Sequence, residues 1–198
     1  MARIGLKVGK YNLIDPETNK YKALSDSTVP MFRKLISASF EAEFNEAELY
    51  ANDTLCENDY TFNKGTLTVT VDDDEDKFVS EILGLNKTTV SESGNEYHYN
   101  TKDNAPEIGF GQVITKKVNG KYQYKVEFLP RVKITDVVSE ANTKGESVEF
   151  GTTEITGTVF AVDKEIGSAK SGDYKIIQTF DDFEKAEAYL DKLLTPSA

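Results

Sequence analysis

The sequence predicts a mainly β protein of the α+β class, built as a single domain of 198 residues with two short helices. Three observations support this prediction: segments in which apolar and polar residues alternate, an Asn-Gly pair between two such segments, and two stretches with helical spacing of apolar residues. Hydrophobic residues make up 38% of the chain, and eleven Phe and ten Tyr supply bulky side chains for one core. This composition argues against general disorder.

The cleanest alternation runs from Ile36 to Phe44. In this segment the apolar residues share one face, and the other face consists of Ser37, Ser39, Glu41 and Glu43. The segments Thr66–Val71 and Lys121–Phe128 alternate in the same way. We therefore expect three strands, each with one face toward a core and one face away from it.

A tight hairpin is predicted at Asn119-Gly120, which lies between the segments Gly111–Val118 and Lys121–Leu129. Both residues tolerate a positive φ, which a two-residue hairpin turn requires. Further segments with strand character are Ile4–Val8, Tyr97–Thr101, Val132–Val138, Thr153–Val162 and Tyr174–Phe180.

The first helix is predicted at Asp74–Leu83. Asp72 or Asp73 can cap its N-terminus, and Gly84 can end it in a left-handed conformation. Its apolar stripe consists of Phe78, Val79, Ile82 and Leu83.

A C-terminal helix is predicted at residues 181–194. Asp181 and Glu184 stand at the spacing of a capping box at its start. The face expected to be buried consists of Phe183, Ala186, Leu190 and Leu193.

Two long segments have weak periodicity. The first begins at Gly9 and belongs to the N-terminal residues 1–33, and the second is the stretch Asn45–Lys64. Connections of this length are unusual inside a compact domain and are often functional. We interpret the first as an extended N-terminal arm and the second as a loop, both stabilised by packing on a neighbouring subunit. The alternative is that both are mobile surface loops.

The excess negative charge of the chain is concentrated in one stretch. Residues 41–76 contain twelve acids and one base, Lys64, and this difference of −11 equals the formal net charge of the whole chain. The pI is about 4.7, so a phosphate backbone should repel the protein. This charge argues against tight sequence-independent DNA binding as a function.

Residues with catalytic or metal-binding chemistry are sparse. Cys56 is the only cysteine and His98 the only histidine, which leaves no disulfide, Cys–His dyad or His-rich metal site to expect. The acids at residues 72–76 alternate as in a calcium loop, but Lys77 stands where that loop requires Gly. No spacing of Asp and Glu indicates a catalytic pair. We expect no enzymatic activity, no cofactor, no metal, and no membrane-spanning or secretory segment.

The stretch from Ala38 to Asp59 reads A-S-F-E-A-E-F-N-E-A-E-L-Y-A-N-D-T-L-C-E-N-D, and that from Gly65 to Gly84 reads G-T-L-T-V-T-V-D-D-D-E-D-K-F-V-S-E-I-L-G. These motifs resemble the major tail proteins, or tail-tube proteins, of long-tailed bacteriophages of the phi13 type. Further matching motifs are Gly109-Phe110-Gly111, Val118–Tyr122 and Phe128–Lys133. The resemblance extends over nearly the full length and is most specific at Glu46–Glu57.

The resemblance implies a β-sandwich tail-tube fold with a flanking helix. Subunits of this family assemble into hexameric rings, and the rings stack into the tube through which phage DNA leaves the capsid. The chain would then be a structural virion protein, synthesised in the host cytoplasm and located in the tail. Its implied partners are further copies of itself and other tail proteins, such as the tape-measure, terminator and distal tail proteins. DNA passes through without specific binding, and no membrane takes part.

For such a tube we expect an acidic wall, which repels DNA and leaves the duplex free to slide. The residues expected to face the lumen are Ser37, Ser39, Glu41 and Glu43. The alternative is that these acids meet lysine-rich surfaces across a contact between rings. We expect the inter-ring contact from Asn45–Lys64, because the following residues are too apolar for a free loop: Leu49, Tyr50, Leu55, Tyr60 and Phe62.

A function of a different class stays open, namely a secreted β-sandwich binding or adhesion module of a bacterial surface. The lack of a recognisable signal segment argues against this alternative. An enzyme built on a β-sandwich has no motif in its favour.

Overall fold

The computed structural model describes residues 2–24, 28–51, 54–90, 94–139 and 151–196, without the side chains of residues 2, 3, 49–51, 54, 55, 89 and 90. Within these residues the chain forms ten strands and two helices. The predicted mainly β class with two helices is therefore confirmed.

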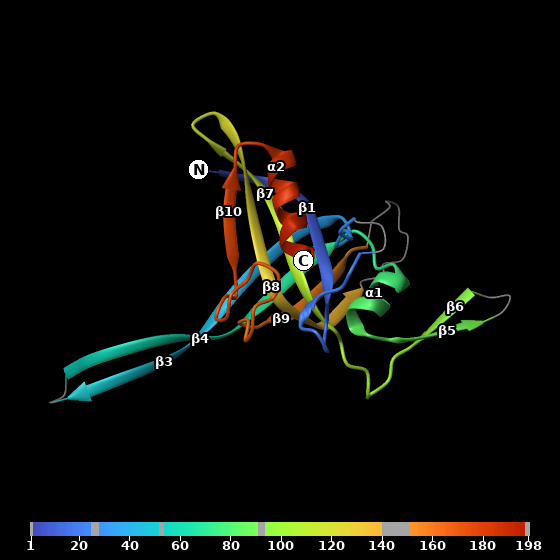
Figure 1. The fold of residues 1–198 in the computed structure, drawn as a ribbon, viewed down its shortest axis with the longest axis horizontal. Coiled ribbons are helices and arrows are strands. Elements are labelled where there is room, and N and C mark those ends of the chain that lie inside the picture. Colours follow the sequence, from blue (N-terminus) through green and yellow to red (C-terminus); the bar gives the residue numbers. More distant parts are fainter. Residues whose placement is uncertain (1, 25–27, 52–53, 91–93, 140–150, 197–198) are drawn as a thin grey trace, which may run out of the picture.

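Eight of the strands form one antiparallel sheet in the order β2-β1-β7-β8-β9-β4-β3, with β10 also paired to β8. Their bounds are β1 Ala2–Asp15, β2 Lys20–Tyr21, β3 Leu35–Ala51, β4 Thr54–Val71, β7 Glu107–Val118, β8 Lys121–Ser139, β9 Thr153–Val159 and β10 Ile176–Phe180. The other two, β5 (Asn86–Val90) and β6 (Gly94–His98), form a separate hairpin. The helices are α1 (Asp76–Leu83) and α2 (Phe183–Leu194), and Figure 1 shows them at different parts of the sheet.

The sheet folds over on itself, so that strands far apart in its order enclose a common core. Tyr11 of β1 and Phe110 of β7 belong to the same buried cluster as Leu67 of β4. The two ends of the sheet also approach each other, because a Cβ added to Gly9 of β1 would lie 2.5 Å from the side chain of Leu35 in β3. Two facing layers therefore bury the core as in a sandwich, although the hydrogen bonds run through a single sheet.

The N-terminal residues 1–33 are not an extended arm, contrary to the prediction. Strand β1 pairs with β7 along almost its whole length. The following segment then returns beside β1, where the amides of Tyr11 and Phe32 donate to the carbonyl oxygens of Pro30 and Gly9. Phe32 is fully buried. This segment is therefore an integral part of the domain.

Polar side chains hide the alternation of β1 in the sequence. Lys10 and Asn12 lie on the face toward α2, next to the buried Val8. The Lys10 Nζ lies 2.7 Å from a carboxylate oxygen of Asp191, and Asn12 Nδ2 donates to the carbonyl oxygen of Leu194 at 2.9 Å. Because α2 supplies these partners, β1 buries both of its faces from Val8 to Asn12 without a clean apolar–polar pattern.

Helix α2 packs on the sheet through the face that the sequence predicts. Leu190 and Leu193 are buried, and Phe183 is partly buried against the same cluster. The N-cap is Asp182 instead of Asp181, and its carboxylate accepts a hydrogen bond from the backbone amide three residues later at 3.1 Å.

Helix α1 ends at Gly84 with a φ of 69°, as predicted, but its start differs from the prediction. The N-cap residue is Glu75, which makes no capping hydrogen bond with its side chain, so capping by Asp72 or Asp73 is wrong. The acids bind a base instead: Nη2 of Arg33 lies 3.2 Å from Asp73 and 2.6 Å from Glu75. The acidic run thus ties α1 to the segment that enters β3.

The predicted hairpin turn is confirmed, because Asn119 and Gly120 have φ values of 50° and 82°. It joins β7 to β8, which pair in register up to the turn. The two strands predicted at Lys121–Leu129 and Val132–Val138 are one continuous strand that passes through Pro130.

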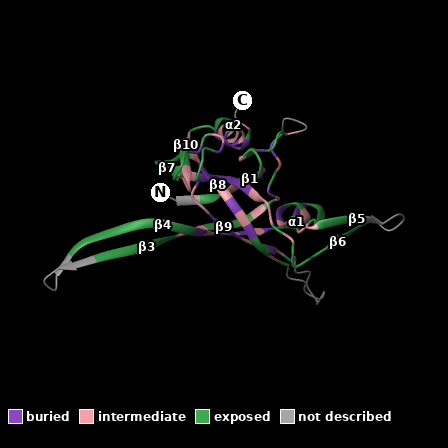
Figure 2. Cartoon of the chain, turned by 60° about the horizontal axis from the view of Figure 1, so that its bottom comes forward, coloured by how far each residue is buried: buried purple, intermediate pink, exposed green. Residues whose placement is uncertain are grey.

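In its described residues, 45–51 and 54–64, the stretch Asn45–Lys64 is not a loop, contrary to the prediction. It belongs to β3 and β4, whose outer parts form a two-stranded ribbon that extends away from the body of the molecule (Figures 1 and 2). We call residues 44–62 of this ribbon the arm. Every arm residue with described burial is exposed except Phe62. Because neither face of the arm is buried within the chain, its sequence does not need to alternate, and the periodicity is weak.

Candidate assembly surfaces

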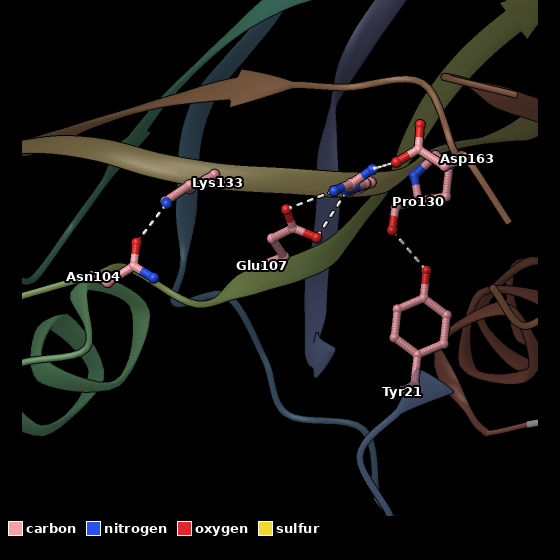
Figure 3. A network of polar contacts seen from close by, with 7 residues as sticks. Tyr21, Asn104, Glu107, Pro130, Lys133 and Asp163 are labelled. Atoms are coloured by element: carbon pink, nitrogen blue, oxygen red, sulfur yellow. Dashed lines mark hydrogen bonds and ion pairs between the residues drawn. The ribbon is translucent and has the colours of Figure 1, made fainter. Parts of the chain in front are cut away.

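Strand β8 changes its partner at its middle, and a polar network fixes it there. Its first half pairs with β10 and its second half with β9. Between the two halves, Arg131 binds both carboxylate oxygens of Glu107 at 2.8 and 2.9 Å and reaches Asp163 at 2.6 Å (Figure 3). The Tyr21 hydroxyl donates to the carbonyl oxygen of Pro130 at 2.9 Å. These contacts hold the part of the sheet that carries α2 relative to the part formed by β8, β9, β4 and β3.

The second half of β8, together with β9, β4 and β3, presents one polar face away from the core. The register places Ser39, Thr68, Thr156 and Asp136 in one row across the four strands. The rows on either side add Ser37, Glu41, Glu43, Lys64, Thr66, Thr70, Lys133, Val138, Glu154 and Thr158. We call these residues the polar face. All four residues predicted to face the lumen lie on it and are exposed, and their role in a lumen stays a prediction.

Half of the residues of the polar face carry a hydroxyl group, and its charged residues have a small excess of acids. Its charged members are four acids and two bases: Glu41, Glu43, Asp136, Glu154, Lys64 and Lys133. The Lys64 Nζ lies 3.5 Å from Glu43, and Lys133 donates to Asn104 at 2.6 Å.

The acidic stretch 41–76 does not gather on one surface. Only Glu41 and Glu43 lie on the polar face, while the other acids of the stretch belong to the arm or precede and begin α1. An acidic lumen wall stays a prediction, but within one copy the acids of the stretch are divided between several surfaces. The reason is that β3, the arm and α1 carry consecutive parts of the stretch to different places.

Two free strand edges border the polar face. Strand β3 is the last in the sheet order, so from Ser37 onward its outer edge has no strand partner among the described residues. Strand β7 stops pairing with β8 at Lys133, which leaves residues 134–139 without a partner on that side in the described part of the chain. A groove of about 430 Å³ runs along this second edge. Nothing in the sequence marks these edges, because they depend on where neighbouring strands begin and end.

The base of the arm is held by aromatic packing within the chain. Phe62 stacks on Tyr174 with ring centroids 3.9 Å apart and nearly parallel planes, and Phe44 meets Phe62 edge-on at 6.0 Å. Phe62, which the sequence places in a contact between rings, is therefore engaged inside the chain.

Farther out, the arm exposes Tyr60, whose side chain is 60% exposed. Its hydroxyl donates to the carboxylate of Glu46, and this hydrogen bond lowers the pKa of Glu46. The side chains of the other residues predicted to contact the next ring lie outside the described part of the structure: Leu49, Tyr50 and Leu55. Of this set, Tyr60 is the residue that the structure leaves open to a partner.

The remaining reactive residues do not form a site in the described residues. His98 is exposed on β6, 3.4 Å from Glu96, and Cys56 is exposed on the arm. No group of three His, Cys, Asp or Glu side chains in this part of the chain is arranged to hold a metal ion. Neither of the two described helices has the length and apolar character to cross a membrane.

Solved structures with a similar shape include two proteins of injection tubes. The tube-terminating cap of the anti-feeding prophage has a TM-score of 0.47 and 11% identity, over 91% of this chain and 95% of that chain. A chain of the sheath–tube complex of an extracellular contractile injection system, PVC, in its extended state has a TM-score of 0.45 and 11% identity, over 87% and 89%. The sequence matches no protein-family model and no curated protein. TM-scores and identities this low show only a similar shape, so we infer the function from the surfaces of this chain.

Proposed function

We propose that this chain is a structural tail-tube subunit of a virion, which joins edge to edge into rings that stack into a conduit for DNA. The observation that carries the proposal is the four-stranded section β8-β9-β4-β3, which has a free edge at each end and one polar face. Two copies join when β3 of one pairs with residues 134–139 of the next. Repetition of this head-to-tail contact closes a ring.

The strand directions favour this joint. Each neighbouring pair in the section is antiparallel, so β3 runs opposite to β8. A joint between β3 and β8 of different copies is therefore antiparallel as well, and the alternation continues unbroken around the ring. Pairing also satisfies the backbone N–H and C=O groups that each edge presents to water in a single copy.

In such a ring the polar face forms the inner wall, because the opposite face of the section packs on the core. The resemblance implies six copies; about 24 strands, spaced about 4.8 Å apart and tilted by about 40°, give a backbone ring about 48 Å across. A wall of hydroxyls with a small excess of acids has few cations to bind phosphates, so DNA slides on water and counterions.

The arm makes the contact between rings in this proposal. It extends beyond the body of the subunit and exposes Tyr60 (Figure 1). Its sequence also includes Leu49, Tyr50 and Leu55. Apolar groups on an isolated ribbon need a protein surface to bury them. The tape-measure, terminator and distal tail proteins are the further partners of such a tube.

Disulfide trapping tests the joint directly. Ser39 and Asp136 stand at the two ends of one row, three strand spacings or about 14 Å apart. This separation is too long for a disulfide within one chain, which requires Cα atoms closer than about 7 Å. In a chain with Cys56→Ser, the pair Ser39→Cys and Asp136→Cys should give a ladder of covalent oligomers on oxidation.

Single-cysteine variants are the matched controls and should give dimers at most. Because the rows of neighbouring copies can be offset, Ser37→Cys and Glu41→Cys are tested with Asp136→Cys as well. Tubes in electron micrographs without any ladder would contradict the β3–β8 joint. A chain that stays monomeric under every assembly condition would contradict the tail-tube function itself.

A further inference from the structure

The arm and the β7–β8 hairpin carry opposite charges. Residues 45–61 contain five acids and no base, whereas residues 108–126 contain four lysines and no acid. Strand β1, which pairs with β7, adds Lys7 beside the hairpin. Figure 1 shows the arm extending to the lower left, with the β7–β8 turn at the top near the N-terminus. The two charged regions therefore do not meet within one chain.

Three lysines near the β7–β8 turn keep their charge available. Lys7, Lys117 and Lys121 form no ion pair with any residue that the structure describes. Lys7 Nζ lies 5.7 Å from the ring of Phe183, and Lys117 Nζ lies 5.8 Å from the ring of Tyr122. An acidic partner can therefore approach these cations without displacing an acid of the chain itself.

A pocket of about 510 Å³ is lined by Lys7 and by Tyr122, whose ring Lys117 approaches, and one of its polar groups has no partner among the described residues. Its walls include Ile4, Lys7, Tyr122 and Thr115. Thr115 is only 7% exposed, and its buried Oγ1 forms no hydrogen bond with the described residues. A buried hydroxyl without a partner is uncommon, because its desolvation is not compensated. The pocket thus offers an occupant a basic rim, apolar walls and one hydroxyl.

We propose that this basic pocket receives the arm of a copy in the adjacent ring. The inference rests on the proposed tail-tube function and names the surface on which the arm docks. Glu57 and Asp59 of the arm are exposed and match the charge of the lysines. The exposed Tyr60 suits the apolar wall, where Ile4 and Tyr122 are 52% and 55% exposed.

The contact joins two different surfaces, so it is heterologous. A heterologous contact that does not close on itself repeats without limit along an axis. This is the property that a stack of rings requires, while the β3–β8 joint closes each ring separately. The two contacts use different residues, so each can be broken alone.

Charge reversal in the full-length chain tests the docking. Lys117→Glu with Lys121→Glu should leave single rings intact and lower the yield of stacked tubes about tenfold, as should Glu57→Lys with Asp59→Lys. A chain that carries all four substitutions should form stacked tubes again, because opposite charges then face each other across the contact. Carbodiimide treatment of wild-type tubes should link Lys117 or Lys121 to the arm of another copy, detected by mass spectrometry.

Thr115→Val is the variant that separates docking from folding. It keeps the shape of the side chain and removes a hydroxyl that has no hydrogen-bond partner among the described residues, so the isolated subunit should melt at the same or a higher temperature. The yield of stacked tubes should nevertheless fall severalfold. An unchanged tube yield would contradict the role of the hydroxyl in docking.

The outcomes distinguish the two proposals. If both charge-reversed pairs stack as the wild type does, the docking surface is wrong while the tail-tube function stands. If the wild type forms no rings at all, the tail-tube function fails and the docking with it. If duplex DNA shifts the wild type in a gel but not the Lys117→Glu, Lys121→Glu variant, the pocket serves nucleic acid and the arm is not its occupant.

Discussion

The β7–β8 hairpin and the arm are both antiparallel ribbons of the same sheet, but they obtain their stability from different sources. Strand β7 is buried from Ile108 to Thr115, between α2 on one face and the folded-over sheet on the other. The arm has no such cover, since Phe44 and Tyr60 are 49% and 60% exposed. A two-stranded ribbon is at best marginally stable alone in water. The comparison shows that one ribbon is covered by its own chain, whereas the described residues of the other are almost all exposed, as the proposed contact between rings requires.

The largest difference is expected from truncating one phenylalanine in each ribbon. Phe110 of β7 is 1% exposed and packs on Phe32 with ring centroids 4.9 Å apart. Phe110→Ala should lower the free energy of unfolding by about 3–5 kcal/mol, and the matched Phe44→Ala in the arm by less than about 1 kcal/mol. Urea denaturation of the monomer measures both. Equal losses would contradict the division between the two ribbons.

The next effect depends on pH and concerns a buried carboxylate in the β7–β8 hairpin. Burial by itself raises the pKa of Glu127, but the hydrogen bond from Lys125 and the charges of Lys175 and Lys125 outweigh it, so the pKa lies below its usual value. A lowered pKa means that the folded state binds fewer protons than the unfolded state. The pairing therefore stabilises the fold above the usual glutamate pKa, and this contribution is lost as the pH falls through the folded-state value.

Glu127→Gln should accordingly lower the free energy of unfolding by about 3 kcal/mol at pH 7. The difference from the wild type should shrink as the pH falls below about 4.3. Denaturation curves at several pH values measure this, with the exposed Glu57→Gln of the arm as the matched control. A difference that does not change with pH would show that the pairing is not the cause.

A smaller effect is expected where the arm joins the body. The parallel stack of Phe62 on Tyr174 should give a coupling energy of about 1 kcal/mol in a double-mutant cycle with Phe62→Leu and Tyr174→Leu. The stack is the clearest contact that fixes the arm on the body, so the double variant should also form shorter tubes. Strictly additive effects of the two changes would indicate that the rings do not interact in solution.

The smallest effect on the monomer is expected from removing the arm. Replacement of residues 46–60 by Asn-Gly places a two-residue turn between Asn45 and Thr61, which face each other in the ladder. The free energy of unfolding should change by less than about 1 kcal/mol, because every residue of the removed part whose burial is described is exposed. Stacking of rings should nevertheless stop. Normal tubes from this variant would exclude the arm from the contact between rings.

The same comparison explains which parts of the fold can be predicted from the sequence. Asn119-Gly120 indicates the hairpin turn because the required φ values occur there, and the alternation of the segment after it predicts the burial of Val126 and Phe128. The position of Gly84 predicts the end of α1 for the same reason. In these places local chemistry and burial agree.

The sequence does not predict the structure where the partner of a residue is distant along the chain, or where the described part of the chain does not cover the residue. Lys10 and Asn12 conceal β1 because the polar groups they meet lie on α2, more than 170 residues later. The arm looks irregular because its residues with described burial, apart from Phe62, are exposed on both faces. The polar face was predictable on β3, but its extension over β9 and β8 depends on the sheet order, which alternation along single strands does not reveal.

Cryo-electron microscopy of the assembled chain tests the central claim most directly. The account predicts that β3 of each copy lies antiparallel to residues 134–139 of the next, and that Ser39 and Glu41 point into the channel. A reconstruction in which the outer edge of β3 is bare, or in which these two side chains lie on the outer wall, would contradict it.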